Sequence, residues 1–121
     1  MSMELLALTD EQRAIQETAR RFAAGRLAPG SQARDAAGKL DRALVREMGA
    51  LGLIGVDLPE AHGGLDAPGM TAGLVMEEIA RGDSNVAYVH LLASLTGGIL
   101  ARHAGRVEPS VNLGQVDPDQ S

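Results

Sequence analysis

The chain has 121 residues, enough for one domain with one hydrophobic core and too few for a nucleotide-binding domain beside a separate substrate domain. Hydrophobic residues make up 45% of the sequence and charged residues 22%, a balance that is typical of a globular domain and excludes a disordered chain. The net charge is −5 without a basic cluster, and cysteine is absent, so the sequence argues against nucleic acid as a partner and excludes disulfides and thiolate metal sites.

The amino-terminal third begins with a helix signal. The composition favours helices in general, because the chain has no Trp, one Tyr and one Phe, and its core is therefore mainly aliphatic. Thr9 and Gln12 have the spacing of a capping box, which predicts a helix that begins at Asp10. Pro29 and Gly30 are expected to end this helix.

The middle of the sequence predicts a connection, a second helix and a loop. The polar segment 31–39 is expected to be a surface connection, after which Asp41 caps the second helix. The residues expected to form the buried stripe of that helix are Leu44, Met48 and Leu51. The segment 53–64, LIGVDLPEAHGG, contains too many glycines and a proline for a long helix, so it is predicted to be a structured loop.

A third helix is predicted from about Pro68 to Arg81. Its expected inward residues are Thr71, Leu74, Val75 and Ile79, and its expected outward residues are Glu77 and Glu78. Asp83 or Ser84 follows this helix and is expected to cap a fourth.

The fourth helix is apolar on nearly all sides from residue 86 to residue 95, a pattern that indicates burial by several neighbours. After two glycines, a short fifth helix is predicted over residues 99–103. Neither a signal peptide nor a membrane span is expected. The predicted fold is all-α, an orthogonal or up-down bundle of four to five helices.

The residues alone present no catalytic set. Glu77 and Glu78 are adjacent on a helix and point about 100° apart, so they cannot flank one substrate atom as acid and base. His62, His90 and His103 lack the spacing of metal ligands. His90 is polar within an apolar helix, and a structural histidine with satisfied hydrogen bonds outweighs a functional one, although both interpretations stay open.

Three blocks of sequence carry a resemblance to a known family. LTDEQRAIQETARRFAAGRLAP, LVREMGALGLIGVDLPEAHGG and GLVMEEIARGDSNVA, in this order and spacing, resemble the amino-terminal helical domain of acyl-CoA dehydrogenases. The most specific piece is GLIGVDLPEAHGG, which is similar to the GLxGxxxPExxGG turn of the family. The resemblance covers roughly residues 5–105.

This resemblance implies that the chain corresponds to one part of a larger subunit, which continues into an FAD-holding domain and a carboxyl-terminal helical domain and usually forms a homotetramer. The family reaction is α,β-desaturation of an acyl-CoA thioester, and an electron-transfer flavoprotein usually receives the electrons. The catalytic carboxylate and the flavin-contacting strands of the family have no counterpart here. The resemblance therefore implies no catalytic, cofactor-binding or metal-binding residue in this chain, and no FAD bound by the chain alone.

The resemblance also implies a role for the fourth helix, which forms one wall of the acyl pocket beside the flavin in the family. The corresponding positions are Ala87, Tyr88, Leu91 and Leu95, and more loosely Ser94 and Thr96. For each residue alone, packing in the core is the simpler interpretation. Tyr88 is the strongest candidate, because its ring can narrow an apolar slot and its hydroxyl needs a partner.

The sequence departs from the family pattern after Gly105, where GRVEPSVNLGQVDPDQS replaces the expected continuation into a helix. We therefore divide the chain into a family domain, 1–105, and an irregular tail, 106–121, and expect a fragment, a truncated or altered reading frame, or a short functional protein. A cytoplasmic location is expected from the absence of cysteine.

Two alternatives to an enzyme part stay open. One is a stand-alone helical interaction module that pairs with a flavoprotein subunit, or with itself, through an exposed apolar surface. The other is a non-functional remnant. The acyl-CoA used depends on residues from all three family domains and is left open.

Overall fold

The fold is a helical assembly, described by a computed structural model for residues 7–103. In chain order its elements are α1 (Asp10–Phe22), η2 (Ala23–Leu27), η3 (Ala28–Gly30), α2 (Ser31–Ala37), α3 (Arg42–Ala50), η4 (Glu60–His62), α4 (Gly69–Gly82) and α5 (Ser84–His103). Element η2 is a π-helix, and η3 and η4 are 3-10 helices. Every regular element in this range is helical, which confirms the predicted all-α fold.

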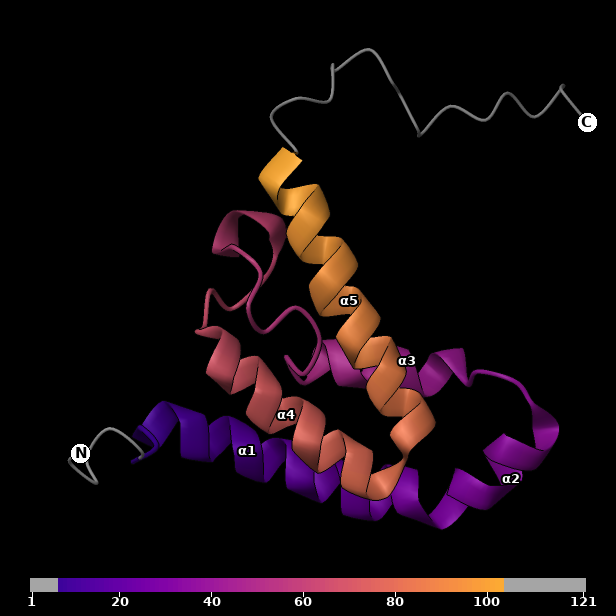
Figure 1. Ribbon diagram of the computed structural model, residues 1–121. Helices are drawn as coiled ribbons and strands as arrows, with labels where there is room; N and C mark the ends of the chain where they lie inside the picture. The colour runs from indigo at the N-terminus through magenta and orange to yellow at the C-terminus, as the bar shows by residue number, and fades with distance from the viewer. Residues whose placement is uncertain (1–6, 104–121) are drawn as a thin grey trace, which may run out of the picture.

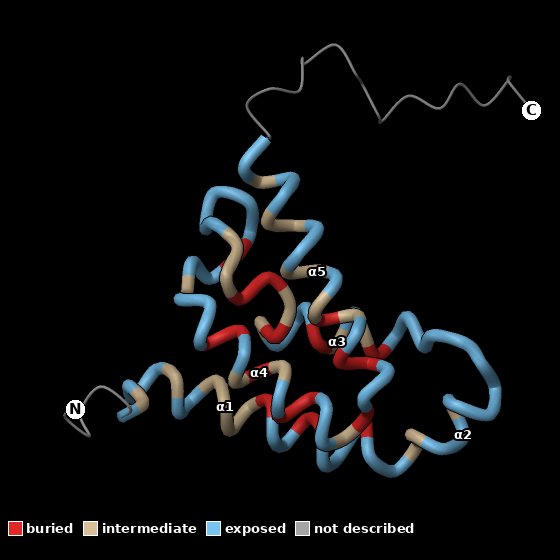
Figure 2. The backbone as a smooth tube through the Cα atoms, viewed as in Figure 1, coloured by how far each residue is buried: buried red, intermediate tan, exposed pale blue. Residues whose placement is uncertain are grey.

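Helix α4 is the centre of the arrangement. Helix α1 and the π-helix η2 pack along α4 on one side, and α5 packs against it on another and rises steeply from its carboxyl end (Figure 1). Figure 2 shows the buried positions gathered where these elements meet, whereas the distal half of α5 carries none. The core is thus concentrated around α4.

Helix α1 begins as the capping box predicts. The Thr9 hydroxyl accepts a hydrogen bond from the Gln12 amide at 3.1 Å, and the Gln12 side chain accepts one from the Thr9 amide at 3.0 Å. The helix buries Ala19 and Phe22 against the core, with Ile15 partly buried beside them. The amphipathic pattern therefore places one face of α1 against α4.

The helical path does not end at Pro29 and Gly30, which corrects that prediction. The segment 31–39 lies at the surface as predicted, but most of it is helix and not an irregular connection. After α1 the backbone widens into η2, in which the Ala28 amide bonds to the Ala23 carbonyl five residues earlier. Pro29 then lies in the first turn of η3, where a missing amide leaves no helical hydrogen bond unmade. Helix α2 follows directly and ends at Gly38 in the left-handed conformation (φ 64°).

Helix α3 is capped as predicted, since the Asp41 carboxylate accepts a hydrogen bond from the Ala43 amide at 3.0 Å. Leu44 and Met48 are buried, but Leu51 is 48% exposed, which corrects the predicted stripe. The reason is that α3 ends at Ala50, so that Leu51 is already part of the turn. The far end of α3 is tied to η2 by an ion pair.

In that ion pair, Arg26 donates two hydrogen bonds to the Glu47 carboxylate, at 2.9 and 2.6 Å. The hydrogen bond from Arg26 lowers the pKa of Glu47. This pair links residues 21 positions apart on the protein surface.

The segment between α3 and α4 is a structured loop, as predicted. It folds back on itself through backbone hydrogen bonds from Asp66 to the Leu58 carbonyl at 2.9 Å and from Ala67 to the Val56 carbonyl at 3.0 Å. Leu53 and Val56 are buried in the core. Gly64 lies so close to Leu58 that any side chain at this position would overlap the Leu58 backbone, which explains the second glycine of the pair.

Helix α4 buries Thr71, Val75 and Ile79 as predicted, but the outward position predicted for Glu78 is wrong. Glu78 is 2% exposed, because its carboxylate faces α1, where it lies 3.4 Å from the side chains of both Arg20 and Gln16. Glu77 is exposed as predicted and bonds to Arg81 at 3.0 Å.

Helix α5 is one continuous helix, so the short separate helix predicted over residues 99–103 is wrong. The two glycines do not interrupt it. Gly97 instead permits close packing, because a Cβ atom there would lie 2.9 Å from a methyl group of Leu58 in the loop. Asp83 caps α5, since its carboxylate accepts hydrogen bonds from the amides of Asn85 at 2.9 Å and Val86 at 3.3 Å.

The expectation that α5 is buried on several sides is also wrong for this chain. Its buried residues are Val86, Ala87 and His90, and its exposed large apolar residues are Tyr88, Leu92, Leu95, Ile99 and Leu100. By length and composition alone α5 is apolar enough to cross a membrane, a criterion that core helices of soluble proteins also meet. The expected absence of a membrane span therefore stays a prediction.

Candidate functional site

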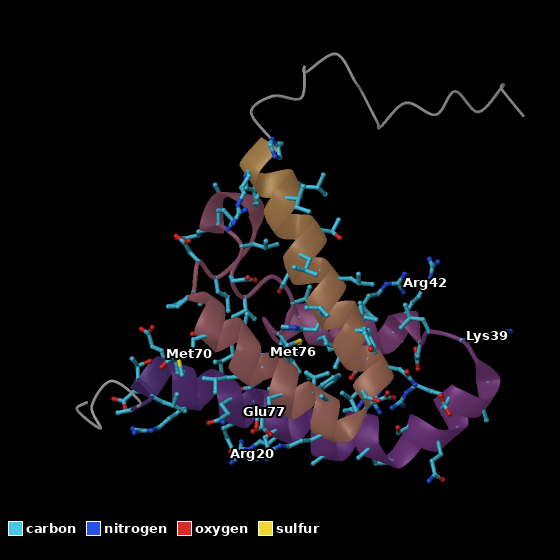
Figure 3. The ribbon with its side chains drawn as sticks, viewed as in Figure 1. Arg20, Lys39, Arg42, Met70, Met76 and Glu77 are labelled. Atoms are coloured by element: carbon cyan, nitrogen blue, oxygen red, sulfur yellow. The ribbon has the colours of Figure 1, made fainter. Side chains whose placement is uncertain are left out.

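The candidate site is a groove between α4 and α5, which we call the α4/α5 groove. It consists of two adjoining cavities, of about 300 Å³ and about 220 Å³, that share Gly73, Met76 and Leu91. The other residues of the larger cavity are Glu77, Ala80, Ser84, Ala87 and Tyr88, and those of the smaller one are Asp57, Gly69, Ala72, His90, Ser94 and Leu95. Figure 3 shows Met76 between the two helices. The lining is mainly apolar, which suits an aliphatic group.

Five of the six residues predicted for the pocket wall line this groove. Ala87 is buried, Leu91 is half-buried, and Tyr88 is 64% exposed at the rim. Ser94 and Leu95 lie one to two turns further along α5. The structure brings these five together on one side of α5, in agreement with the helical spacing.

Thr96 is the predicted wall residue that the structure does not bring to the groove. It is exposed and lines neither of the two cavities. The reason is the continuity of α5: without a break after Leu95, the next residue turns away by one helical step.

The groove residues contributed by α4 were not predicted from the sequence, and Gly73 and Met76 are the two that line both cavities. A Cβ atom added to Gly73 would meet no atom within 4 Å, so this glycine leaves open space over the groove. A glycine in the interior of a regular helix costs stability relative to alanine. The presence of Gly73 inside α4 was therefore the sequence signal that could have indicated a functional position. Pairing it with α5 required knowledge of how the two helices pack.

The hydrogen-bonded pair Asp57 and Ser94 lies at the end of the smaller cavity. The Ser94 hydroxyl donates to the Asp57 carboxylate at 3.0 Å, which connects α5 to the loop before α4. The Ser94 hydroxyl therefore donates its hydrogen bond to a neighbour within the domain, as small polar side chains near loops commonly do.

His90 is buried beside this pair, and the expectation that its hydrogen bonds are satisfied is wrong. The residue is 2% exposed, and neither ring nitrogen has a hydrogen-bond partner among the described residues. Burial lowers the pKa of His90 below the ordinary value of 6.5, and the negative charge of Asp57 opposes this shift. The imidazole is therefore neutral at neutral pH.

The charged side chains around the groove do not favour the anionic diphosphate of FAD. A dinucleotide carries an anionic diphosphate, which proteins hold with cations or with backbone amides at helix starts. The charged side chains that line the two cavities are Glu77 and Asp57, which have the wrong sign. We therefore derive no step through a flavin from these residues. Within residues 7–103, no group of three or more metal-ligating side chains comes together.

The fold and the groove define a helical domain with an apolar groove that is open to solvent beside Tyr88 and Leu95. The sequence from residue 9 to residue 108 matches the family model described as "Acyl-CoA dehydrogenase, N-terminal domain". The chain belongs to the acyl-CoA dehydrogenase family, which confirms the resemblance drawn from the sequence.

Three proteins with sequences similar to this chain all have "CoA dehydrogenase" in their names. The chain is 43% identical over 90 residues to benzylmalonyl-CoA dehydrogenase of Aromatoleum aromaticum, an alignment that covers 74% of this chain and 24% of the relative. It is 31% identical over 85 residues to the mitochondrial short/branched chain specific acyl-CoA dehydrogenase of Bos taurus, covering 70% and 20%. It is also 31% identical over 83 residues to the probable acyl-CoA dehydrogenase YngJ of Bacillus subtilis, covering 67% and 22%. The chain thus spans about a quarter or less of the length of these relatives.

Proposed function

We propose that this domain supplies one wall of the acyl pocket of an acyl-CoA dehydrogenase. The observation that carries the proposal is the larger cavity of the groove, in which Ala87, Tyr88 and Leu91 of α5 face Gly73 and Met76 of α4 across about 300 Å³. This volume lies at the lower end of the range for small-molecule sites, and apolar side chains dominate its lining. An acyl chain fits such a slot because its transfer from water to an apolar surface is favourable.

The groove is shallow at one side, and this agrees with a wall rather than a complete pocket. Tyr88 and Leu95 border the groove and are more than half exposed, so further protein is needed to enclose a ligand there. Family membership implies FAD in full-length enzymes, and the desaturation of the thioester would take place on parts of the subunit beyond this domain. An electron-transfer flavoprotein would then accept the electrons.

We expect the chain alone to be inactive as a dehydrogenase. Both carboxylates that line the groove already have a hydrogen-bond partner, because Glu77 accepts from Arg81 at 3.0 Å and Asp57 accepts from Ser94 at 3.0 Å. Neither is placed as a free base over the groove. Purified chain should show no flavin absorption and no bleaching on addition of an acyl-CoA, and a yellow protein that bleaches with thioester would contradict this expectation.

A chimera tests the pocket wall. Residues 9–108 of this chain would replace the corresponding segment of the Aromatoleum enzyme, to which they are similar. The chimera would be assayed for kcat/KM with acyl-CoA substrates of increasing size. Leu91→Phe should shift the preference toward smaller acyl groups, because the larger ring fills the groove, and Tyr88→Ala should shift it toward larger ones.

Arg46→Ala is the control for the chimera, since Arg46 is exposed on α3 and does not line the groove. It should leave the substrate preference unchanged. If Leu91→Phe, Tyr88→Ala and the control all gave the same preference as the unmodified chimera, the groove would not be the acyl wall.

A second candidate function is supported by the exposed face of α5. Its large apolar residues Leu92, Ile99 and Leu100 are each more than half exposed and lie outside the larger cavity. We propose as the alternative that the chain is a helical interaction module that docks onto a flavoprotein subunit through this face. A stable complex with a separately expressed flavin-binding subunit, lost on Leu92→Lys, would favour the module, and its absence would favour the pocket-wall function.

A cytoplasmic location is also a proposal. It is supported by the lack of cysteine, which is compatible with a reducing compartment. Fractionation of cells that express the chain would test it, and recovery with the membrane fraction would contradict it.

A further inference from the structure

His90 is a buried polar side chain that neither the core nor the groove explains. It lies on α5 two residues from Tyr88, but on the side that faces α4 and the loop, and it is 2% exposed. Both of its ring nitrogens lack a hydrogen-bond partner within residues 7–103. A buried polar group without a partner destabilises the folded state, so its presence at this position requires an explanation.

The surroundings of the imidazole contain one opposing charge. From α4, the residues that line the same cavity are Gly69, Ala72, Gly73 and Met76, and none of them ionises. From α5 itself the lining residues are Leu91, Ser94 and Leu95. The loop contributes Asp57, whose carboxylate acts on the imidazole through its charge and accepts the hydrogen bond of Ser94. Asp57 is therefore the charged group that faces His90 from the elements packed around it.

The neutral and the charged imidazole differ in the hydrogen-bond partners and the solvation that they require. A neutral ring packs between the two helices as a flat, largely apolar group. An imidazolium carries two N–H donors and a full charge, and the burial of an unpaired charge is costly. No hydrogen bond joins either ring nitrogen to the Asp57 carboxylate in this packing, so water or a movement of α5 would have to satisfy the charged ring.

We propose that His90 is an acid-sensitive switch at the α4/α5 junction: its neutral imidazole permits close packing, and its protonation loosens α5 from α4. Leu91 and Leu95 follow His90 on the same helix and line the groove, so movement of this part of α5 would change the width of the groove. The switch follows from the burial and neighbours of His90 and is independent of the acyl-CoA proposal.

The sign of the pH dependence follows from linkage. The pKa of His90 is lower in the folded state than the ordinary 6.5 of an unfolded chain, so the unfolded state binds more protons between the two values. The stability of the fold with a neutral His90 is therefore fully present above pH 6.5, and it falls as the pH drops toward the pKa of His90 in the folded state. Across this window the unfolding constant rises by up to about tenfold per pH unit.

Urea unfolding of the full 121-residue chain between pH 8 and pH 5 tests the switch. Wild type should lose stability below pH 6.5 relative to His90→Leu and His90→Gln, neither of which can take up this proton. The variants His62→Gln and His103→Gln are the controls, because both residues are exposed, and they should retain the wild-type dependence on pH. Parallel curves for wild type and both His90 variants would overturn the proposal.

Two further measurements test the switch on wild-type protein and do not depend on whether a variant folds. The ring protons of His90, followed by NMR, should titrate with a midpoint below 6.5, and a midpoint at or above this value would overturn the proposal. Amide exchange, corrected for the intrinsic effect of pH, should speed up in the buried turn of α5 from Val86 to His90 before it does so in α1. Equal acceleration throughout the domain would indicate global unfolding and reject a local switch.

Discussion

Arg34 and Asp83 lie 49 residues apart in the chain and meet through two hydrogen bonds to one carboxylate oxygen, at 3.0 and 2.9 Å. The other oxygen of Asp83 caps α5 by accepting hydrogen bonds from two backbone amides. Arg34 also donates to the carbonyl of Leu27 in the π-helix. The Arg34–Asp83 pair thus connects α2, the π-helix and the connection between α4 and α5.

Substitution of Asp83 should separate its two tasks. Asp83→Ala removes both the ion pair and the cap and should lower the free energy of unfolding by about 3–5 kcal/mol, because the partly buried Arg34 loses its partner. Asp83→Asn keeps an oxygen that can cap α5, so it should be less damaging by about 1 kcal/mol. Urea denaturation followed by circular dichroism measures both values.

The control for this pair is Asp10→Asn at the exposed ion pair between Asp10 and Arg13, where little change is expected. Equal losses from Asp83→Ala and Asp83→Asn would show that the cap contributes nothing.

The same substitution at two glycines of α4 should have opposite effects. Gly82→Ala would place a Cβ atom 2.7 Å from the carbonyl oxygen of Ala23, a backbone atom that cannot move aside, and should destabilise by about 1–3 kcal/mol. Gly73→Ala meets no atom within 4 Å and should stabilise by about 0.5–1 kcal/mol, because alanine favours a helix interior. Thermal unfolding of the two variants provides the comparison, and a stabilised Gly82→Ala would refute the close contact between α4 and η2.

Alanine substitutions at the two adjacent glutamates of α4 should differ in their effect on stability. Glu78→Ala removes the buried acceptor of Gln16 and Arg20 and should cost about 1–3 kcal/mol of stability. Glu77→Ala removes an exposed side chain that bonds only to Arg81 among the described residues, and should have little effect. Chemical denaturation at neutral pH distinguishes them. Equal effects would mean that the ionic contact between α1 and α4 does not hold these helices together.

The exposed apolar face of α5 predicts association of the isolated chain. Leu92 and Ile99 lie on one side of the helix, two turns apart, and both are more than half exposed. Leu92→Lys with Ile99→Lys should reduce self-association without loss of helix content, since neither side chain belongs to the core. Sedimentation velocity over a range of concentrations tests this prediction, which fails if the wild-type chain is monomeric throughout.

Local signals were sufficient to predict much of the fold from the sequence. The capping box at Thr9, the cap at Asp41 and the cap at Asp83 are interactions between near neighbours, and all three are confirmed. The five wall residues that meet at the groove lie on one helix, so helical periodicity was enough to group them. Their role in an acyl pocket came from the family resemblance and remains a proposal.

The errors arose where distant segments decide the outcome. Glu78 is buried because Arg20, 58 residues earlier, lies opposite it, and no pattern within α4 reveals this partner. Gly97 lies inside α5 in close contact with Leu58 of the distant loop, whereas local propensity indicates a break. The burial of His90, whose ring nitrogens have no hydrogen-bond partner in the described part of the chain, is likewise a property of the packing between α4, α5 and the loop, which the order of residues along α5 does not contain.

The π-helix from Ala23 to Leu27 sets the rotational phase of everything that follows it up to Gly38. Each residue of a helix turns the following chain by a fixed angle, about 100° in an α-helix, so deletion of one residue from this wide turn would rotate and shift α2 about the axis of η2. The guanidinium of Arg34 would then point away from the α4–α5 connection. The number of residues in this short stretch therefore decides whether Arg34 reaches Asp83.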